Sequence, residues 1–254
     1  MPSATSPSNP NRAEVLSELR RMLSRMEGVA QQEEARLSFG LPALDTYLPQ
    51  NGLAFGAVHE ITAASEADLP AAFGFFVSLL ARTPGHGPLL LVLSSRKLAR
   101  CGTPHGDGLA DLGLDPSRLT LVETANEAEA LWATEEAVRA RGPAAVAGVL
   151  GGKLTLKDSQ RLSHAAREAN LPLLLLRAGE AADVATAATR WRIGAAPAAR
   201  DRFGLLSGWR WHATLERCRN GRPGNWMLEF DHATHRFGLA AAMADPSLAC
   251  GGAT

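Results

Sequence analysis

One stretch of the chain, residues 37–80, constrains the fold more than any other. It contains a short helix pattern at Gly40 to Asp45, a glycine-bounded turn at Gly52 to Gly56, and a strand pattern from Ala57 to Ala63. A loop and an apolar helix from Leu69 to Leu80 follow. A buried strand joined by a short loop to a hydrophobic helix is a unit from which open α/β sheets are built.

Further apolar runs repeat this pattern along the chain. Each is short and suits a strand buried on both faces of a parallel sheet: Leu89–Leu93, Leu119–Val122, Ala144–Leu150 and Leu171–Leu176. Helices are expected between them at 105–112 and after Asn126, whose capping role is supported by Glu129 three residues later. The segment Leu154–Ser159 leads into a further helix that continues through Ala169. The sequence therefore predicts an α/β fold with a mostly parallel central sheet and helices on both faces.

The last part of the chain has a different pattern. Thr189 to Ile193 is another strand, and the segments Trp209–Arg217 and Asn225–Phe230 alternate bulky and polar residues with a period of two. Asn220 and Gly221 lie between these segments and are typical of a hairpin turn. We expect a C-terminal antiparallel hairpin at the edge of the sheet.

At 254 residues and 46% hydrophobic composition, the chain can bury one substantial core. We expect four parts: a disordered tail at 1–11, an amphipathic helix and connector at 12–36, a core domain including the hairpin at 37–236, and a flexible tail at 237–254. The helix has an apolar stripe that packs either on the chain's own core or on another protein; the stripe includes Val15, Leu19, Met22 and Leu23.

Charge and cysteine usage exclude several classes of protein. The 26 basic and 26 acidic residues balance, so the chain as a whole does not attract polyanions strongly. Three scattered cysteines predict neither a disulfide framework nor a metal site, and they suit a reducing cytosol. There is no apolar signal region at the N-terminus and no run of about 18 apolar residues, so we expect a cytoplasmic protein without a membrane partner.

The loop after the strand Ala57–Ala63 has the strongest functional signal. Its residues include Ala63, Ala64, Ser65, Asp68, Leu69 and Pro70. The stretch resembles the entry of RecA-type ATPases, in which backbone amides wrap the phosphates, Lys neutralises them, and Ser or Thr binds Mg²⁺. In that register Leu69 replaces the Lys, Pro70 replaces the hydroxyl, and Asp68 brings a negative charge where phosphate would lie.

The carboxylates of such a site are absent as well. In the same register, the strand Leu89–Leu93 leads to Ser95 instead of the acid that activates water. The strand Ala144–Leu150 ends at Gly151 instead of the aspartate that holds Mg²⁺. We therefore expect a RecA-like P-loop NTPase core with degenerate Walker motifs. It should have no ATPase activity, no catalytic residue, no bound cofactor and no metal.

Arginine is concentrated between residues 190 and 236. This segment has nine arginines and four acidic residues, a local charge of about +5 in a chain of zero net charge. Four tryptophans lie in the same segment. It is either a surface for a partner protein or single-stranded DNA, or a hairpin with core tryptophans and solvated arginines. The candidate contact residues are Arg190, Arg192, Arg217, Arg219, Arg222 and Trp226.

Several motifs extend the resemblance beyond RecA-type proteins in general. In order, they are Gly40–Asp45, Gly52–Glu60, Glu129–Ala137, Thr189–Arg192, and Arg219–Arg222 followed by Trp226–Glu229. Together they resemble the ImuA family of bacterial RecA-like proteins, over residues 37–232.

That resemblance implies a function in SOS-inducible mutagenesis. Proteins of the ImuA family are accessory to translesion DNA synthesis and act with ImuB, a polymerase-like protein that links to the sliding clamp, and with an error-prone polymerase. For this chain it implies a non-catalytic adaptor that binds ImuB and is recruited to the nucleoid. RecA, a second copy of the chain and single-stranded DNA are further candidate partners.

Two other functions stay open at the level of sequence. One is an ATP-dependent RecA paralogue that uses an unrecognised phosphate site such as Lys153, although the residues around Lys153 do not match a phosphate-binding loop. The other is an inhibitor of cell division of the SulA kind, since SulA is another degenerate relative of RecA. Co-purification with the division GTPase, instead of ImuB, would favour the inhibitor.

Overall fold

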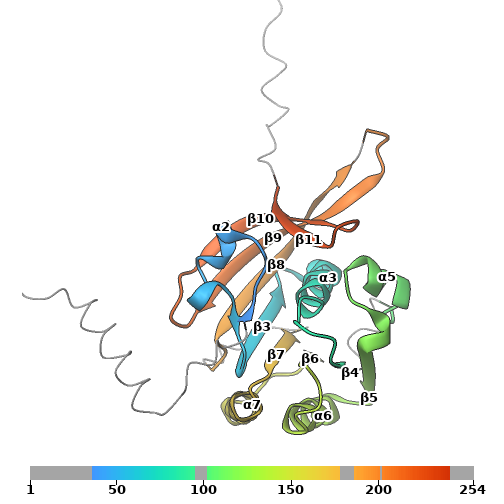
Figure 1. Ribbon diagram of the computed structural model, residues 1–254. Helices are drawn as coiled ribbons and strands as arrows, with labels where there is room; N and C mark the ends of the chain where they lie inside the picture. The colour runs from blue at the N-terminus through green and yellow to red at the C-terminus, as the bar shows by residue number, and fades with distance from the viewer. Residues whose placement is uncertain (1–35, 95–101, 178–185, 201, 241–254) are drawn as a thin grey trace, which may run out of the picture. The chain divides into compact units, whose positions relative to one another are not determined.

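The computed structural model describes residues 36–94, 102–177, 186–200 and 202–240. They form a two-stranded sheet and a nine-stranded sheet with the order β11-β10-β9-β8-β3-β7-β6-β4-β5 (Figure 1). Strand β3 (Ala57–Ala63) lies between β7 (Pro172–Arg177) and β8 (Thr189–Arg200) and is parallel to both. The parallel part continues through β6 (Ala145–Leu150), β4 (Leu89–Ser94) and β5 (Leu119–Thr124).

The C-terminal strands complete the sheet in antiparallel pairing. Strand β9 (Leu206–Cys218) pairs with β8 and with β10 (Gly224–Asp231), and β10 pairs with β11 (Arg236–Leu239). Asn220, in the turn between β9 and β10, has a φ of 63°, a left-handed conformation that Asn tolerates well. The predicted mostly parallel sheet and the C-terminal antiparallel hairpin are both confirmed.

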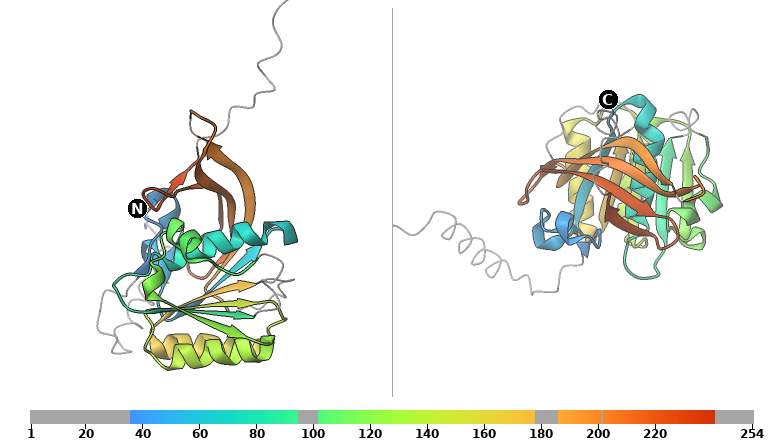
Figure 2. Two further views of the ribbon diagram at one scale, coloured as in Figure 1. Left: turned by 90° about the vertical axis from the view of Figure 1, so that its right-hand side faces the viewer. Right: turned by 90° about the horizontal axis from the view of Figure 1, so that it is seen from above.

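Helices cover both faces of the parallel strands (Figure 2). Helix α3 (Leu69–Leu80) lies on one face, and α6 (Glu127–Arg139) and α7 (Leu156–Ala169) lie on the other. Successive side chains of a strand point to opposite faces, so each strand contributes to two cores. In β7, Leu174 and Leu176 join the core on the α3 side, whereas Leu173 and Leu175 join the core on the α6 and α7 side. No helix in the described ranges is long and apolar enough to cross a membrane.

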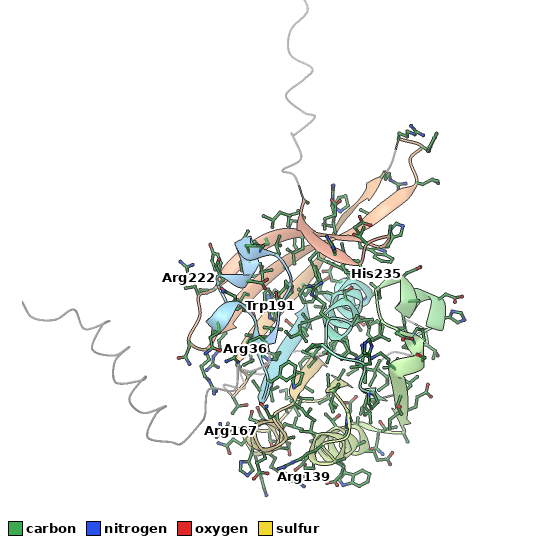
Figure 3. All side chains as sticks on the ribbon, in the orientation of Figure 1. Arg36, Arg139, Arg167, Trp191, Arg222 and His235 are labelled. Carbon is green, nitrogen blue, oxygen red and sulfur yellow. The ribbon has the colours of Figure 1, made fainter. Side chains whose placement is uncertain are left out.

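The core on the α3 side is rich in aromatic rings from distant parts of the chain. Phe39, Phe75 and Trp191 pack with ring centroids 5.2 to 6.0 Å apart. Phe237 of β11 lies against the same group, and Trp191 is fully buried in the interior (Figure 3). Most residues of α3 are buried, which explains why its sequence is apolar around nearly the whole helix.

The segment before β3 packs on the same core. It contains β1 (Arg36–Leu37), α2 (Pro42–Asp45), a 3-10 turn (Pro49–Asn51) and β2 (Leu53–Ala54). The Asp45 carboxylate is buried and accepts hydrogen bonds from the Ser38 hydroxyl and from the amides of Phe39 and Leu41. The acid of the Gly40–Asp45 motif therefore stabilises the chain entry to α2.

Helices α6 and α7 begin at well-formed caps. The Asn126 side chain accepts a hydrogen bond from the Glu129 amide, and the Glu129 carboxylate accepts one from the Ala125 amide. Helix α7 begins with a capping box between Thr155 and Asp158. The predicted Asn126 cap is confirmed. Shorter helical segments are α5 (Gly106–Asp111), η2 (Glu66–Asp68) and η3 (Pro116–Arg118).

Two segments extend beyond their predicted bounds. Strand β8 continues from Ile193 to Arg200, because β9 provides hydrogen-bond partners for this extension. The core also continues past the predicted boundary at residue 236, because β11 pairs with β10 and its Phe237 is only 6% exposed. Residues 237–239, expected in a flexible tail, therefore belong to the sheet.

Candidate functional site

The loop between β3 and α3 is the site that the sequence singles out. Strand β3 ends at Ala63, and α3 begins at Leu69. Between them, the Asp68 carboxylate joins the loop to the sheet, because its Oδ1 accepts a hydrogen bond from the Ala195 amide of β8 at 2.8 Å. Its Oδ2 accepts a second hydrogen bond from the Ser65 hydroxyl at 2.6 Å. Asp68 therefore fixes the loop to β8 and also links it to Ser65 within the loop.

Several backbone amides of this loop are already used inside the protein. Three of them donate to backbone carbonyls: Ala64 to Ile193, Asp68 to Ser65, and Leu69 to Glu66. Pro70 has no amide hydrogen. A phosphate-binding loop needs consecutive amides that converge on the ligand. At these four positions the amide is either committed elsewhere or absent.

The charge at the start of α3 is negative. The Ser65 hydroxyl, and to a smaller extent the Ala195 amide, lower the pKa of the Asp68 carboxyl below its usual range. The group is therefore ionised at neutral pH, next to a helix N-terminus that favours an anion. Leu69, in the register of the phosphate-binding lysine, is 8% exposed and packs in the core on the α3 side. Where a nucleotide site has a cation, this site has a buried leucine beside a carboxylate.

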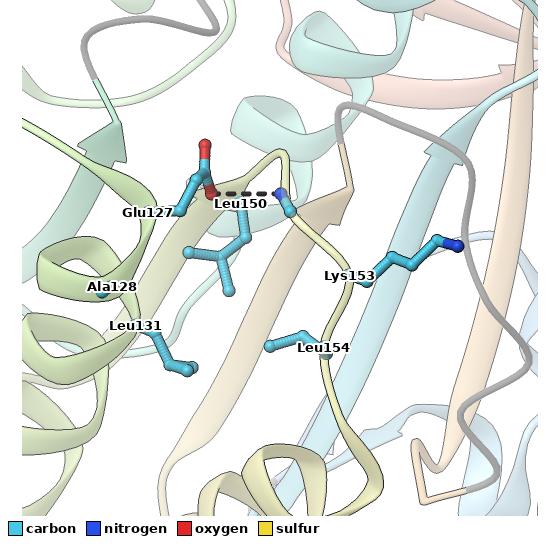
Figure 4. A pocket seen from close by; sticks show the side chains of 7 residues that line it. Glu127, Ala128, Leu131, Leu150, Lys153 and Leu154 are labelled. Atoms are coloured by element: carbon cyan, nitrogen blue, oxygen red, sulfur yellow. Dashed lines mark hydrogen bonds between the residues drawn. The ribbon is translucent and has the colours of Figure 1, made fainter.

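A second polar arrangement lies at the carboxyl end of β6 (Figure 4). Glu127 Oε2 accepts hydrogen bonds from the amides of Gly151 at 2.7 Å and Gly152 at 3.2 Å. Arg177, the last residue of β7, donates to the Gly152 carbonyl at 2.6 Å. Burial lowers the pKa of the Arg177 guanidinium, and the carboxylates of Glu60 and Glu127 oppose this shift.

Sequence reasoning missed Glu127. It identifies Gly151 as the position without a metal-binding acid, but it does not identify the acid that reaches this position from the preceding helix, α6. The signal was weak, because Glu127 is the first residue after the Asn126 cap and reads as an ordinary first-turn acid. Within the structure its Oε2 serves to hold the turn after β6.

A small pocket of about 130 Å³ lies beside Glu127, between α6 and the chain leading to α7. It is lined by Glu127, Ala128, Leu131, Leu150, Gly152, Lys153 and Leu154. The Lys153 side chain points away from the Glu127 carboxylate (Figure 4). Pockets for cofactors and drug-sized ligands usually span roughly 300–1,000 Å³. This pocket is therefore too small for a nucleotide and suits an apolar side chain.

Arg190, expected at a contact surface, is buried. Its guanidinium pairs with the Glu60 carboxylate of β3 at 3.0 Å, and the two side chains are 10% and 2% exposed. Removing one member of a buried ion pair leaves an uncompensated charge, which is strongly destabilising. Arg190 therefore stabilises the contact between β3 and β8 and is not placed to touch DNA.

Other candidate contact residues lie on different faces of the antiparallel strands. Arg222 lies over the Tyr47 ring at 4.6 Å, at the surface (Figure 3), and Trp226 packs edge-on against the same ring at 5.0 Å. Trp226 also packs against the core on the α3 side. Arg192 lies on the opposite face by strand alternation and pairs with Glu216. The structure thus brings Arg222 and Trp226 together and separates both from Arg192.

The remaining predicted site residues have separate environments. Arg219 donates to the Thr186 carbonyl at 3.0 Å, and Arg217 is exposed near the end of β9. The predicted docking stripe lies outside the described residues: Val15, Leu19, Met22 and Leu23. Within the described part of the chain, no group of three or more His, Cys, Asp or Glu side chains is placed to hold a metal ion.

No protein-family model matches the chain. It is similar to Protein ImuA of Caulobacter vibrioides strain NA1000/CB15N, with 34% identity over 234 residues that cover 84% of this chain and 92% of that protein. The chain belongs to the ImuA family. Protein ImuA of Caulobacter vibrioides strain ATCC 19089 gives the same identity and coverage. Because the match takes in 92% of the Caulobacter protein, it concerns nearly the whole ImuA chain and not one shared module.

Proposed function

We propose that this protein is a non-catalytic accessory factor of the ImuA–ImuB mutagenesis system. It binds ImuB and supports an error-prone polymerase in translesion DNA synthesis. It is recruited to the nucleoid for this function. Membership of the ImuA family supports the assignment to this system. The geometry of the loop after β3 supports the absence of ATP chemistry, and the hydrogen bond from Ala195 to Asp68 is the observation that carries it.

The physical reason is electrostatic. In a partly screened site, two like unit charges 4 Å apart repel by about 4 kcal/mol. A phosphate placed beside the Asp68 carboxylate meets this repulsion without a lysine at position 69 to offset it. A repulsion of that size lowers affinity by about a thousandfold. We propose that the sheet is a RecA-type core whose nucleotide site has been replaced by an internal tether between loop and sheet.

A binding experiment with purified ImuB of the same organism tests this function. The full-length chain should form a complex with ImuB equally well with and without ATP and Mg²⁺, because no nucleotide state controls the loop. Two results would contradict the proposal. One is a complex that forms only with ATP. The other is the lack of any complex together with co-purification of the cell-division GTPase.

The ATP-dependent alternative places phosphate near Lys153. The adjoining pocket measures about 130 Å³ and is lined largely by leucine and alanine side chains, so it gives this alternative no support. We predict that Lys153→Ala complements damage-induced mutagenesis as well as the wild-type gene in a deletion strain. Loss of mutagenesis in a stably expressed Lys153→Ala protein would favour the ATP-dependent alternative.

A further inference from the structure

The outer ends of β8 and β9 extend beyond their neighbouring strands, and residues 194–208 are called the arm here. Strand β3 pairs with β8 only as far as Ile193, and β10 pairs with β9 only as far as Gly208. Toward the tip of the arm, β8 and β9 pair with each other, up to Arg200 and Leu206. Figure 1 shows the arm in orange, extending beyond the neighbouring strands.

The tip of the arm has two large apolar side chains. Phe203 is 71% exposed and Leu205 is 65% exposed, the highest values for large apolar side chains in the described part of the chain. Transfer of such side chains from water into an apolar pocket is favourable. Because both side chains lie on one projecting loop, a partner that covers the tip buries both of them.

Described residues of the tip contact one another. Arg200 donates from Nη1 to the Gly204 carbonyl at 2.6 Å, and the Arg202 guanidinium lies 4.7 Å from the centre of the Phe203 ring. Gly204 has a φ of 79°, a conformation that favours glycine.

The charge of the tip argues against nucleic acid as its partner. Arg200 and Arg202 flank Asp201, so the net charge is +1, and residues 194–199 are uncharged. Affinity for nucleic acids depends on the number of phosphates that are neutralised. Two arginines beside two apolar side chains instead match a protein surface on which an apolar pocket is bordered by carboxylates.

Strand addition along the arm is also disfavoured. On the side of β8 that faces β3, the Ala195 amide is bonded to Asp68. The next residue on that side, Pro197, has no amide hydrogen to offer to an added strand. The β8 edge of the arm is therefore poorly suited to strand addition, and the tip is its main apolar feature.

We propose that this tip is the docking element for a protein partner that presents an apolar pocket bordered by carboxylates, and that this partner is ImuB. The geometry of the tip stands by itself, whereas the identity of the partner rests on the proposed function. Phe203 and Leu205 enter the pocket, and Arg200 and Arg202 pair with its acidic border.

Binding of immobilised ImuB to the full-length chain, measured by biolayer interferometry, tests this assignment. The double variant Phe203→Ser, Leu205→Ser should raise the Kd at least tenfold. The single variant Arg202→Glu should also raise the Kd, with an effect that weakens at high salt. The control is Leu239→Ser, which removes an apolar side chain of 48% exposure from β11 and should leave the Kd unchanged. Circular dichroism and Tm should show that all variants fold.

Each other outcome overturns the inference in a recognisable way. If wild type binds ImuB and the double variant binds within twofold of it, the tip is not the docking element, and the proposed function stands. If the double variant keeps ImuB binding and loses binding to a single-stranded oligonucleotide, the tip is a nucleic-acid contact. If wild type does not bind ImuB, both the inference and the proposed function are wrong.

Discussion

At the scale of single residues, His59 shows how the fold depends on a neutral buried group. Its Nε2 lies 2.9 Å from the Ala54 carbonyl, and its Nδ1 lies 2.9 Å from the Thr189 hydroxyl. A carbonyl can only accept, so Nε2 carries the proton and Nδ1 accepts from the threonine. The neutral ring thereby links β3 to β2 and β8. Burial lowers the pKa of His59 from 6.5 to about 4.

We predict that this residue makes stability depend on pH. The pKa is lower in the folded state, so the unfolded state takes up the proton first, and stability falls as pH decreases from 6.5 to about 4. The loss from this group is about 3 kcal/mol. Urea unfolding across this pH range measures it, and His59→Gln should flatten that part of the profile. An unchanged slope in the variant would exclude His59 as the cause.

Gly221 is required for a different reason, which is close packing. A Cβ at this position would lie 2.4 Å from the Cys218 sulfur and 2.5 Å from the Tyr47 carbonyl oxygen. Overpacking of this kind typically costs about 1–3 kcal/mol. We predict that Gly221→Ala lowers the free energy of unfolding by this amount in urea titrations. Gly142→Ala is the control, because its Cβ would meet nothing within 4 Å. Equal stabilities of the two variants would be inconsistent with this packing.

At the scale of elements, β3 and α3 could be predicted residue by residue. Helix α3 is an almost continuous apolar run, and β3, although it contains His59, Glu60 and Thr62, is bounded by Gly56 and by the polar loop. Strand β11 could not be predicted, because four residues without a clear alternation give no periodic signal. Its stability comes from pairing with β10 and from the contacts of Phe237 with distant aromatic rings.

We predict that Phe237→Ala destabilises the protein by about 3 kcal/mol, because it opens a cavity among Phe39, Phe75 and Phe230. Thermal unfolding followed by circular dichroism measures the effect. Leu239→Ala on the same strand is the control and should change stability by less than about 0.5 kcal/mol, since Leu239 is half exposed. A comparable small change in both variants would show that β11 does not contribute to the core.

The loop after β3 also connects two elements, since Asp68 joins it to β8 by a hydrogen bond. We predict that Asp68→Ala costs about 1–2 kcal/mol of stability, because two hydrogen bonds to a carboxylate are lost. Hydrogen exchange localises the effect: the Ala195 amide should exchange faster, whereas core amides of β7 should change only with global stability. Undiminished protection of the Ala195 amide in the variant would refute the tether.

At the scale of the whole molecule, the fold separates arginines that are concentrated in one segment of the sequence. The arginines between residues 190 and 236 suggest one basic surface, but period-two strands send neighbouring side chains to opposite faces. Arg190 is removed from the surface by Glu60, which lies 130 residues away in the sequence. The local composition predicts neither this separation of the side chains nor the buried pair of Arg190 and Glu60. The sequence alone predicts leucine in place of the phosphate-binding lysine, because this depends only on the alignment of the loop with a RecA-type phosphate-binding loop. The hydrogen bond between Asp68 and Ala195 could be found only from the structure.

The central claim is that this fold no longer binds nucleotide. Isothermal titration calorimetry of the full-length chain with ATP and Mg²⁺ tests it most directly. We predict no saturable heat up to millimolar ATP, because the loop between Ala63 and Pro70 has a carboxylate in place of a cation. Saturable binding at micromolar ATP that requires Mg²⁺ and changes in Asp68→Ala would contradict the account.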